Sequence, residues 1–352
     1  MSARRCAARR GAAWRLAVLA VLVAVLFAAD LALGSVRIPL SAVLRSLSGA
    51  ATESVWSSIV LVFRLPKALT ALVAGAALAV SGLILQTVFR NHLAGPDSLG
   101  VGAGASVGVA LVVLASGGPG SALLSGLGLA GYGLLSLASS AGAAVVLVLI
   151  LALSRRFQDA VTLLIVGLLV GYLAGSMVSL LVYFGSPQKV QVFLGWTYGS
   201  FASVTRRELP VLYGSIGVGL ALTLGSSKAL NALLLGESFA EGLGIRVRSA
   251  RARILAAAAI LAGAVTAFCG PVAFLGIAAP QAARRIFRSS DHALLIPASA
   301  LVGSVFALAA DVATQAPGGG SVLPVNPLLA LIGAPIILGL FLRSSRSGEA
   351  QA

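Results

Sequence analysis

The chain has 352 residues, of which 59% are hydrophobic and 10% are charged, and its mean hydropathy is +1.02. A soluble domain carries about a quarter charged residues, so this composition excludes a soluble protein. The net charge of +15 comes without a basic face or a nucleic-acid-binding motif, so it indicates membrane topology and no nucleic-acid partner. The cysteines (Cys6, Cys269) and histidines (His92, His292) are scattered, which excludes a disulfide framework, a metal site and metal catalysis.

A transmembrane helix needs about 20 apolar residues, and apolar segments between charged or Gly/Pro-rich joints predict about ten such spans. The eighth is short and starts at Pro271, so its neighbours must bury it. For the first span, a secretory signal peptide is the alternative. A retained helix is favoured because the apolar run continues through Leu33 without a clear cleavage site. The predicted spans are 16–34, 68–88, 99–116, 131–153, 161–184, 209–226, 254–269, 271–283, 294–313 and 325–342.

The basic residues predict the orientation of the chain. With the N-terminus inside and ten spans, 18 of the 25 Lys and Arg residues fall on the inner side and 7 on the outer side. This is the direction that the positive-inside rule requires, so both termini are expected in the cytoplasm. The predicted organisation is a cytoplasmic tail (1–15), a single transmembrane domain (16–342) and a second cytoplasmic tail (343–352).

A weak internal repeat is visible in the second and seventh spans. Gly75, Ala76, Ala79 and Gly82 recur at the same spacing as Gly263, Ala264, Ala267 and Gly270. Five spans separate the copies, so they run in opposite directions, as in transporters with inverted repeats. The alternative is an ordinary helix-packing surface of small residues.

Hydrolytic or redox chemistry would need a nucleophile with its base, paired carboxylates or a cofactor loop, and the sequence offers none. Asp30 and Asp311 fall near outer helix ends, where solvated or helix-capping roles are favoured. Three proline positions predict broken helices at membrane depth. They are Gly270-Pro271, Ala279-Pro280 and Ala334-Pro335.

The longest predicted cytoplasmic joint, 228–253, has two short amphipathic helices separated by glycine. Its exposed apolar residues and two acids lie within a basic joint, which favours docking into a groove of another protein over a passive surface loop.

Four segments resemble the FecCD family, the permease subunits of type II ABC importers for iron-siderophores, haem and cobalamin. They occur in order along nearly the whole chain, with the family's spacings. The segments are RLPKALTALVAGAALAVSGLILQTVFRNHLAGPDSLGVGAGASVG (64–108), LNALLLGESFAEGLGI (230–245), GPVAFLGIAAPQAARRIF (270–287) and LPVNPLLALIGAPIILGLFLR (323–343).

The resemblance implies an all-α polytopic permease of about ten helices in the bacterial cytoplasmic membrane. It implies a second permease subunit (homo- or heterodimer), two cytoplasmic ATPases, an extracytoplasmic binding protein and no cofactor. Three groups of site residues are carried over from the family. They are an ATPase-coupling segment (Leu235, Gly236, Glu237, Ala240, Glu241, Leu243, Gly244), a cytoplasmic gate (Asn91, Leu93, Ala160, Val161) and docking residues for the binding protein (Arg64, Lys67).

The chain departs from the family at His92, Gln281, Asn326 and near Gln315. Variation at Gln281 and Asn326 occurs among siderophore and haem importers, which favours an iron chelate as cargo over the alternative, cobalamin. The chain has no Walker A sequence, so we expect a partner to hydrolyse ATP. An ion-coupled secondary transporter and an intramembrane enzyme are the remaining alternatives; the sequence shows neither midplane ionisable groups nor paired catalytic groups.

Overall fold

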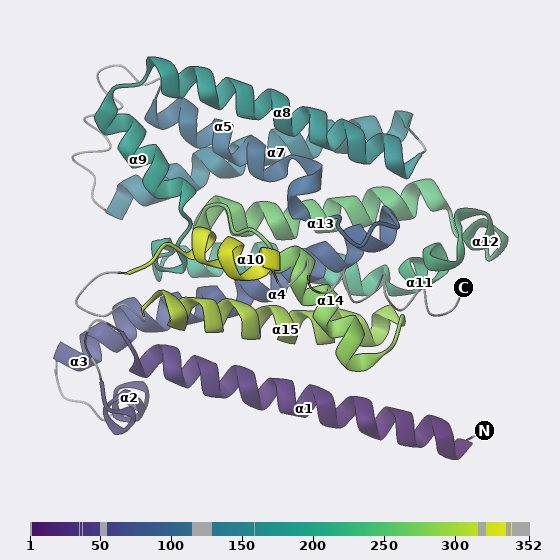
Figure 1. The fold of residues 1–352 in the computed structure, drawn as a ribbon, viewed down its shortest axis with the longest axis horizontal. Helices are drawn as coiled ribbons and strands as arrows, with labels where there is room; N and C mark the ends of the chain where they lie inside the picture. The colour runs from purple at the N-terminus through teal and green to yellow at the C-terminus, as the bar shows by residue number, and fades with distance from the viewer. Residues whose placement is uncertain are drawn as a thin grey trace.

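The computed structural model describes residues 2–34, 36, 38–49, 55–114, 129–157, 159–315, 322–335 and 339, with the backbone alone at 2–10, 129–133, 155 and 160. These residues form helices and connecting turns, and no strand occurs among them (Figure 1). The helices are α1 (Ser2–Ala32), α2 (Leu40–Leu47), α3 (Val55–Ser58), the π-helical turn η1 (Ile59–Arg64), α4 (Leu65–Val88), the 3₁₀ turn η2 (Pro96–Leu99), α5 (Val101–Val113), α7 (Leu129–Arg156), α8 (Ala160–Phe184), α9 (Pro187–Thr197), η3 (Phe201–Ser203), α10 (Leu209–Gly225), α11 (Ser227–Leu235), α12 (Glu237–Gly242), α13 (Val247–Cys269), α14 (Leu275–Phe287), α15 (His292–Thr314) and a last helix at Val325–Pro335.

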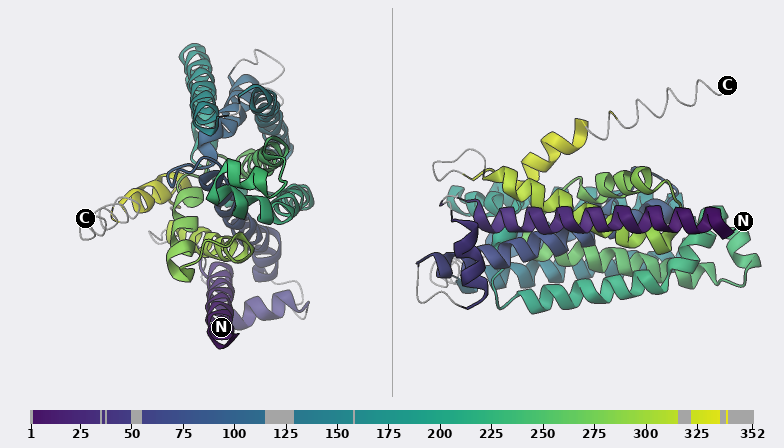
Figure 2. Two further views of the ribbon diagram at one scale, coloured as in Figure 1. Left: turned by 90° about the vertical axis from the view of Figure 1, so that its right-hand side faces the viewer. Right: turned by 90° about the horizontal axis from the view of Figure 1, so that it is seen from below.

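The long helices form one bundle with a common axis. Seen end-on, α1 lies at one edge of the bundle and α8 at the opposite edge (Figure 2). Among the described residues, six helices are long and apolar enough to cross a membrane, or seven if the bent pair α10–α11 is one span. Two further apolar helices, α5 and Val325–Pro335, are shorter. The all-α polytopic fold is confirmed, and the count of ten spans stays a prediction.

Several boundaries differ from the prediction. Helix continues from Val55 to Val88, so the second span begins 13 residues before the predicted start at 68. The structure also contains α2 and α9, which were not predicted because both are short and carry polar residues. The backbone of the predicted N-terminal tail belongs to α1, and the tail 343–352 lies outside the described residues.

The eighth predicted span is a helix of 13 residues, α14, and its neighbours bury seven of these residues, as expected. Its N-terminus follows a break after Gly270, where φ is +73°. The predicted break at Ala279-Pro280 is wrong, because Pro280 lies inside α14. Proline removes the hydrogen bond to the carbonyl four residues earlier, here Gly276, and the helix continues through this position. The predicted break at Ala334-Pro335 lies at the border of the described residues, so it stays a prediction.

Helix α4 is the most deeply buried long helix in this bundle, and glycines let other backbones approach it. A Cβ on Gly75 would overlap the carbonyl oxygen of Gly303 in α15, and a Cβ on Gly303 would overlap the carbonyl oxygen of Gly75. A Cβ on Gly82 would overlap the carbonyl oxygen of Gly276, the group that Pro280 leaves without its helical donor. Small residues at such crossings allow close helix packing in membranes.

The two copies of the repeat are antiparallel. Helix α4 runs from α3 toward the end that holds α11, and α13 runs back from α12 (Figure 1). Each copy is followed by a short helix of 13 residues, α5 after α4 and α14 after α13. α5 packs on α13, and α14 packs on α4, so each short helix contacts the repeat helix of the other half. This arrangement agrees with the predicted inverted repeat.

We expect Gly75→Ala to lower the free energy of unfolding by about 1–3 kcal/mol, because the added methyl group forces α4 and α15 apart. The matched control is Gly217→Ala in α10, where a Cβ meets no atom within 4 Å. Thermal unfolding of the detergent-purified protein measures the difference. Equal midpoints for the two variants would contradict the close contact between α4 and α15.

Candidate functional site

The predicted coupling segment projects at one end of the bundle, where α11 and α12 form the turn between α10 and α13 (Figure 1). Gly236 separates the two helices with a φ of +131°, and Gly244 follows α12 with a φ of +79°. Both values lie in the region that favours glycine. The two glycines therefore set the path of the segment.

Three apolar side chains of this segment point into solvent. Leu235 is 69% exposed, Phe239 48% and Leu243 61%, whereas Ala240 is fully buried. In the sequence the three residues are spaced by four, but the break at Gly236 separates Leu235, the last residue of α11, from Phe239 and Leu243, which are one helical turn apart. Phe239 was absent from the predicted site residues, although its spacing from Leu235 and Leu243 is a signal in the sequence. We call Leu235, Phe239 and Leu243 the apolar triplet.

The two acids of the segment differ in their surroundings. Glu237 forms an ion pair with Arg251 of α13, whose side chain is 5% exposed. Glu241 is exposed and forms no ion pair with another described residue. Replacing Glu237 with a basic residue would place a second positive charge beside the buried Arg251, so Glu241 is the better position for testing contact with a partner.

The predicted gate residues lie in two joints at the same end as α12. Asn91 follows α4, and its Oδ1 accepts a hydrogen bond from the amide of Leu93, which is 51% exposed. Val161 is 57% exposed in the first turn of α8, and only the backbone of Ala160 is described. Asp159 caps this turn by accepting hydrogen bonds from the Thr162 amide and hydroxyl.

Two hydrogen bonds hold the joint after α4 to neighbouring helices, one to its backbone and one from its Arg90 side chain. Gln281 Nε2 of α14 donates to the carbonyl oxygen of His92 at 3.0 Å. Arg90, with a φ of +47°, donates from Nη2 to the carbonyl oxygen of Leu233 near the end of α11 at 3.2 Å. The joint after α4, which we call the gate joint, is therefore in direct contact with the coupling segment.

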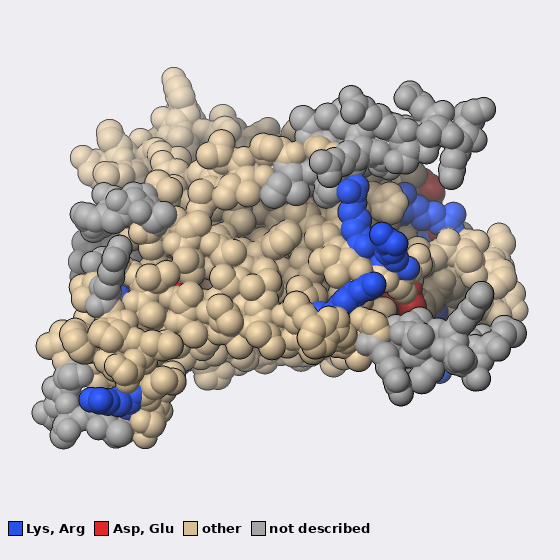
Figure 3. Space-filling view, turned by 60° about the horizontal axis from the view of Figure 1, so that its bottom comes forward, with Lys and Arg blue, Asp and Glu red and all other residues tan. Residues whose placement is uncertain are grey.

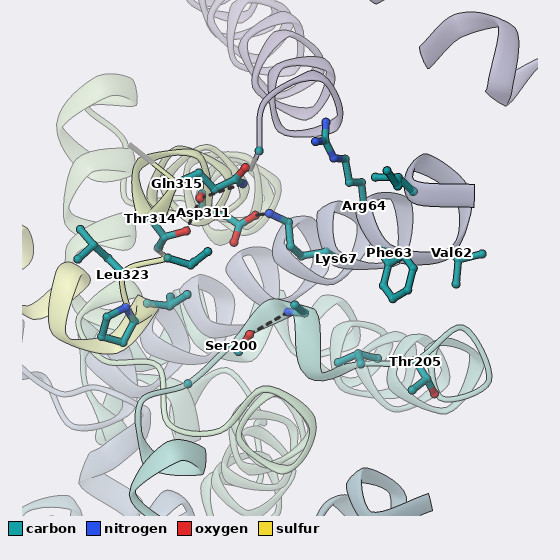
Figure 4. A pocket seen from close by; sticks show the side chains of 18 of the residues that line it. Val62, Phe63, Arg64, Lys67, Ser200, Thr205, Asp311, Thr314, Gln315 and Leu323 are labelled. Atoms are coloured by element: carbon teal, nitrogen blue, oxygen red, sulfur yellow. Dashed lines mark hydrogen bonds and ion pairs between the residues drawn. The ribbon is translucent and has the colours of Figure 1, made fainter. Parts of the chain in front are cut away.

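At the opposite end, a cavity of about 1330 Å³ lies between the ends of α4, α10 and α15 (Figure 4). Lys67 lies at its wall, 2.7 Å from Asp311 Oδ2 and 3.2 Å from Asp30 Oδ1. Gln315 Nε2 donates to Asp30 Oδ1 at 3.0 Å. We call Asp30, Lys67, Asp311 and Gln315 the outer cluster.

The outer cluster corrects the interpretation of the two carboxylates. Asp30 is 0% exposed and Asp311 3%, so neither is solvated, and Asp311 lies inside α15 rather than at a cap. Burial of a charged group requires a partner, and Lys67 supplies it from another helix. Sequence spacing could not show this pairing, because the three residues belong to α1, α4 and α15.

Arg64 closes the end of α1. Its Nη1 donates to the carbonyl oxygens of Leu31 at 2.8 Å and Ala32 at 2.9 Å, and its Nη2 donates to that of Val36. These are orphan carbonyls at and beyond a helix C-terminus, where a cation is favourable. Arg64 is 7% exposed, so it would have to leave these acceptors to reach another protein. Arg206 and Arg207, which line the same cavity, are exposed.

The described residues contain no group of three or more His, Cys, Asp or Glu side chains placed to hold a metal ion. Basic side chains on the face in Figure 3 gather toward the end that holds α11 and α12, and an uncharged belt covers the middle. Such a belt is the surface expected to face lipid.

We expect Lys67→Met to lower the free energy of unfolding by about 3–5 kcal/mol, because it leaves two buried carboxylates without their cation. Adding Asp311→Asn should restore part of the loss. Lys228→Met, at an exposed lysine of α11, is the control. Thermal unfolding in detergent measures all three. A Lys67→Met protein as stable as the Lys228→Met protein would show that the outer cluster does not hold α1 to the bundle.

Comparisons with known proteins agree with this architecture. A permease protein of the hemin transport system of Yersinia pestis, HmuU, is 35% identical over 324 residues, which cover 90% of this chain and 94% of the relative. A permease protein of the vitamin B12 import system of Citrobacter koseri, BtuC, is 31% identical over 288 residues, which cover 80% of this chain and 82% of the relative.

A solved structure described as an inward-facing conformation of a metal-chelate type ABC transporter has a TM-score of 0.80 at 26% identity. It covers 93% of this chain and 98% of that one. The model of the FecCD transport family matches residues 21–343. The chain therefore belongs to the FecCD transport family, the permease subunits of ABC importers.

Proposed function

We propose that this permease imports an iron chelate, a ferric siderophore or haem, which an extracytoplasmic binding protein delivers. The observation that carries the proposal is the 35% identity to a hemin permease over 90% of the chain, against 31–32% to cobalamin permeases over 80%. The second candidate is cobalamin, since those permeases are also similar over most of their length.

The assembly we propose contains a second permease subunit, identical or different, and two cytoplasmic ATPases. It lies in a bacterial cytoplasmic membrane with both termini in the cytoplasm. The uncharged belt and the excess of basic residues at the end that holds α12 support this orientation (Figure 3).

The coupling segment is our candidate for the ATPase contact. Its apolar triplet is exposed at a solvated end of the molecule, where water penalises a cluster of apolar side chains. A groove that buries Leu235, Phe239 and Leu243 removes this penalty, and the exposed Glu241 can meet a basic residue at its rim. Gly236, Ala240 and Gly244 shape the segment, and Glu237 holds it to α13 through Arg251.

The gate and docking assignments remain proposals. Asn91, Leu93, Ala160 and Val161 lie in joints at the end that holds the coupling segment, as a cytoplasmic gate requires. Arg64 and Lys67 are proposed to orient the binding protein, although both are held by partners within the chain. The exposed Arg206 and Arg207 offer a second pair of cations at the same cavity.

The cargo is tested with the complete transporter, purified by a tag on this permease and reconstituted with its binding protein. We expect ATP-driven uptake of haemin or of a ferric siderophore into proteoliposomes, and none of cyanocobalamin. Uptake of cyanocobalamin alone would establish the second candidate. The same vesicles without ATP are the control.

We expect Leu243→Asp to reduce the ATPase recovered with the tagged permease by about tenfold or more, since a charge in a buried apolar contact costs more than 1 kcal/mol. Ser290→Asp adds the same charge at an exposed position of the same end and should leave recovery unchanged. Unchanged recovery for Leu243→Asp would remove the apolar triplet from the ATPase contact.

A further inference from the structure

His292 is a buried histidine outside every predicted group of site residues. It is the first residue of α15, its exposure is 0%, and its ring touches polar groups from two other helices. Nδ1 lies 2.7 Å from Asn231 Oδ1 in α11, and Nε2 lies 2.8 Å from Thr87 Oγ1 in the last turn of α4. One imidazole therefore bridges the coupling helix and the helix that leads into the gate joint.

The contacts of Asn231 determine which ring nitrogen of His292 carries hydrogen. Asn231 Nδ2 donates to Asp291 Oδ1 at 2.8 Å, and its Oδ1 accepts from the backbone amide of His292 at 2.8 Å. These bonds fix the orientation of the amide group, so a carbonyl oxygen faces Nδ1. Nδ1 must then be the donor, which leaves Nε2 of the neutral ring as an acceptor.

Thr87 completes the bridge from the side of α4. Its Oγ1 lies 2.8 Å from His292 Nε2 and 2.9 Å from the carbonyl oxygen of Leu83, but the hydroxyl has one hydrogen. Arg284 Nη2 of α14 approaches the same oxygen at 3.4 Å as a donor. Because Nε2 accepts, the hydrogen of the Thr87 hydroxyl points to His292. The lone pairs of the same hydroxyl oxygen then face Arg284. Every ring nitrogen is then satisfied in a neutral, buried ring.

The anchor of the bridge at α11 is itself held in place. Asp291 caps α15 by accepting from the Ala293 amide at 3.0 Å. The hydrogen bonds from the Asn231 side chain and the Ala293 amide hold the pKa of the Asp291 carboxyl below its ordinary value. Asp291 therefore stays ionised at neutral pH and keeps the Asn231 amide in the orientation that His292 requires.

We propose that His292 is a positioning residue for coupling, which holds α11 and the last turn of α4 in a fixed relation so that displacement of α11 reaches the gate joint. This inference rests on the proposed role of α11–α12 in ATPase contact. The Arg90 contact to Leu233 runs beside the bridge, so α4 is attached to α11 at two points one turn apart. Packed elements joined in this way move together.

The first test determines the tautomer of His292 and its hydrogen bond to Thr87. The chain has two histidines, so a protein labelled with ¹⁵N-histidine gives two imidazole spin systems, and His92→Gln assigns them. We expect the Nδ1–H tautomer at His292, and a shift of its Nε2 signal in Thr87→Val. The Nε2–H tautomer, or no change in Thr87→Val, would overturn the proposal.

The second test measures how nucleotide changes the accessibility of the gate joint in the complete transporter without cargo. Leu93→Cys, in a chain with Cys6→Ser and Cys269→Ala, reports the gate joint through its rate of labelling by an impermeant maleimide, with and without AMP-PNP. We expect Thr87→Val to reduce the nucleotide-dependent change in labelling rate by about fivefold, and Thr87→Ser, which keeps the hydroxyl, to stay within about twofold of the parent.

The matched control is Thr223→Val in α10, a buried threonine whose hydroxyl bonds the carbonyl oxygen of Gly219 in its own helix at 2.8 Å. It loses the same kind of group and should keep the nucleotide response. Equal responses in Thr87→Val and Thr223→Val would overturn the coupling role. Failure of the parent permease to retain any ATPase would instead refute the proposed function, so the two failures are distinguishable.

Discussion

Close contact between backbones at Gly75 and Gly82 holds helix α4 inside the bundle, and both ends of the molecule are built on that helix. A side chain at either position would separate α4 from α15 or α14. Because α4 is surrounded, the positions of Lys67 at its start and Thr87 at its end are fixed relative to each other. A shift of α4 along its axis would therefore alter the outer cavity and the gate joint together.

The charges buried at the end of the bundle that holds Lys67 agree with a permease rather than an ion-coupled transporter. The carboxylates of Asp30 and Asp311 share Lys67, and Arg64 lies beside them at the end of α1. In the chain's described part, this cluster lies at a helix end and not at the middle of the spans.

Much of the fold could be predicted from the sequence, because long apolar runs such as α8 and α15 have few alternatives in a membrane. The inverted repeat left only a weak signal in the sequence, because Gly75 and Gly82 face other backbones whereas Gly263 meets side chains. Helices α2 and α9 could not, because short amphipathic segments look like joints. The break predicted at Pro280 was wrong. Proline leaves the Gly276 carbonyl without its helical donor, and the oxygen of that carbonyl packs on Gly82 inside the bundle.

The candidate site can be proposed from the sequence only in part, for a physical reason. The coupling segment is continuous in sequence, so its glycines and exposed apolar residues mark it directly. The His292 bridge joins α4, α11 and α15, and no spacing rule connects residues 87, 231 and 292. The contact made by Asn326 likewise joins distant parts of the chain. Its Oδ1 accepts from the Ala273 amide at 3.0 Å and so holds the last described helix to the segment before α14, a contact that only the fold reveals.

The central claim is that α11 and the gate joint move as one body, and a distance between spin labels tests it most directly. Labels at Lys228 in α11 and Leu93 in the joint occupy exposed positions. Pulsed electron paramagnetic resonance on the complete transporter, with and without AMP-PNP, gives the distance between them. The account predicts a change of less than about 2 Å between the two states. A change of about 5 Å or more, one helical turn, would show that the two elements move independently and would contradict it.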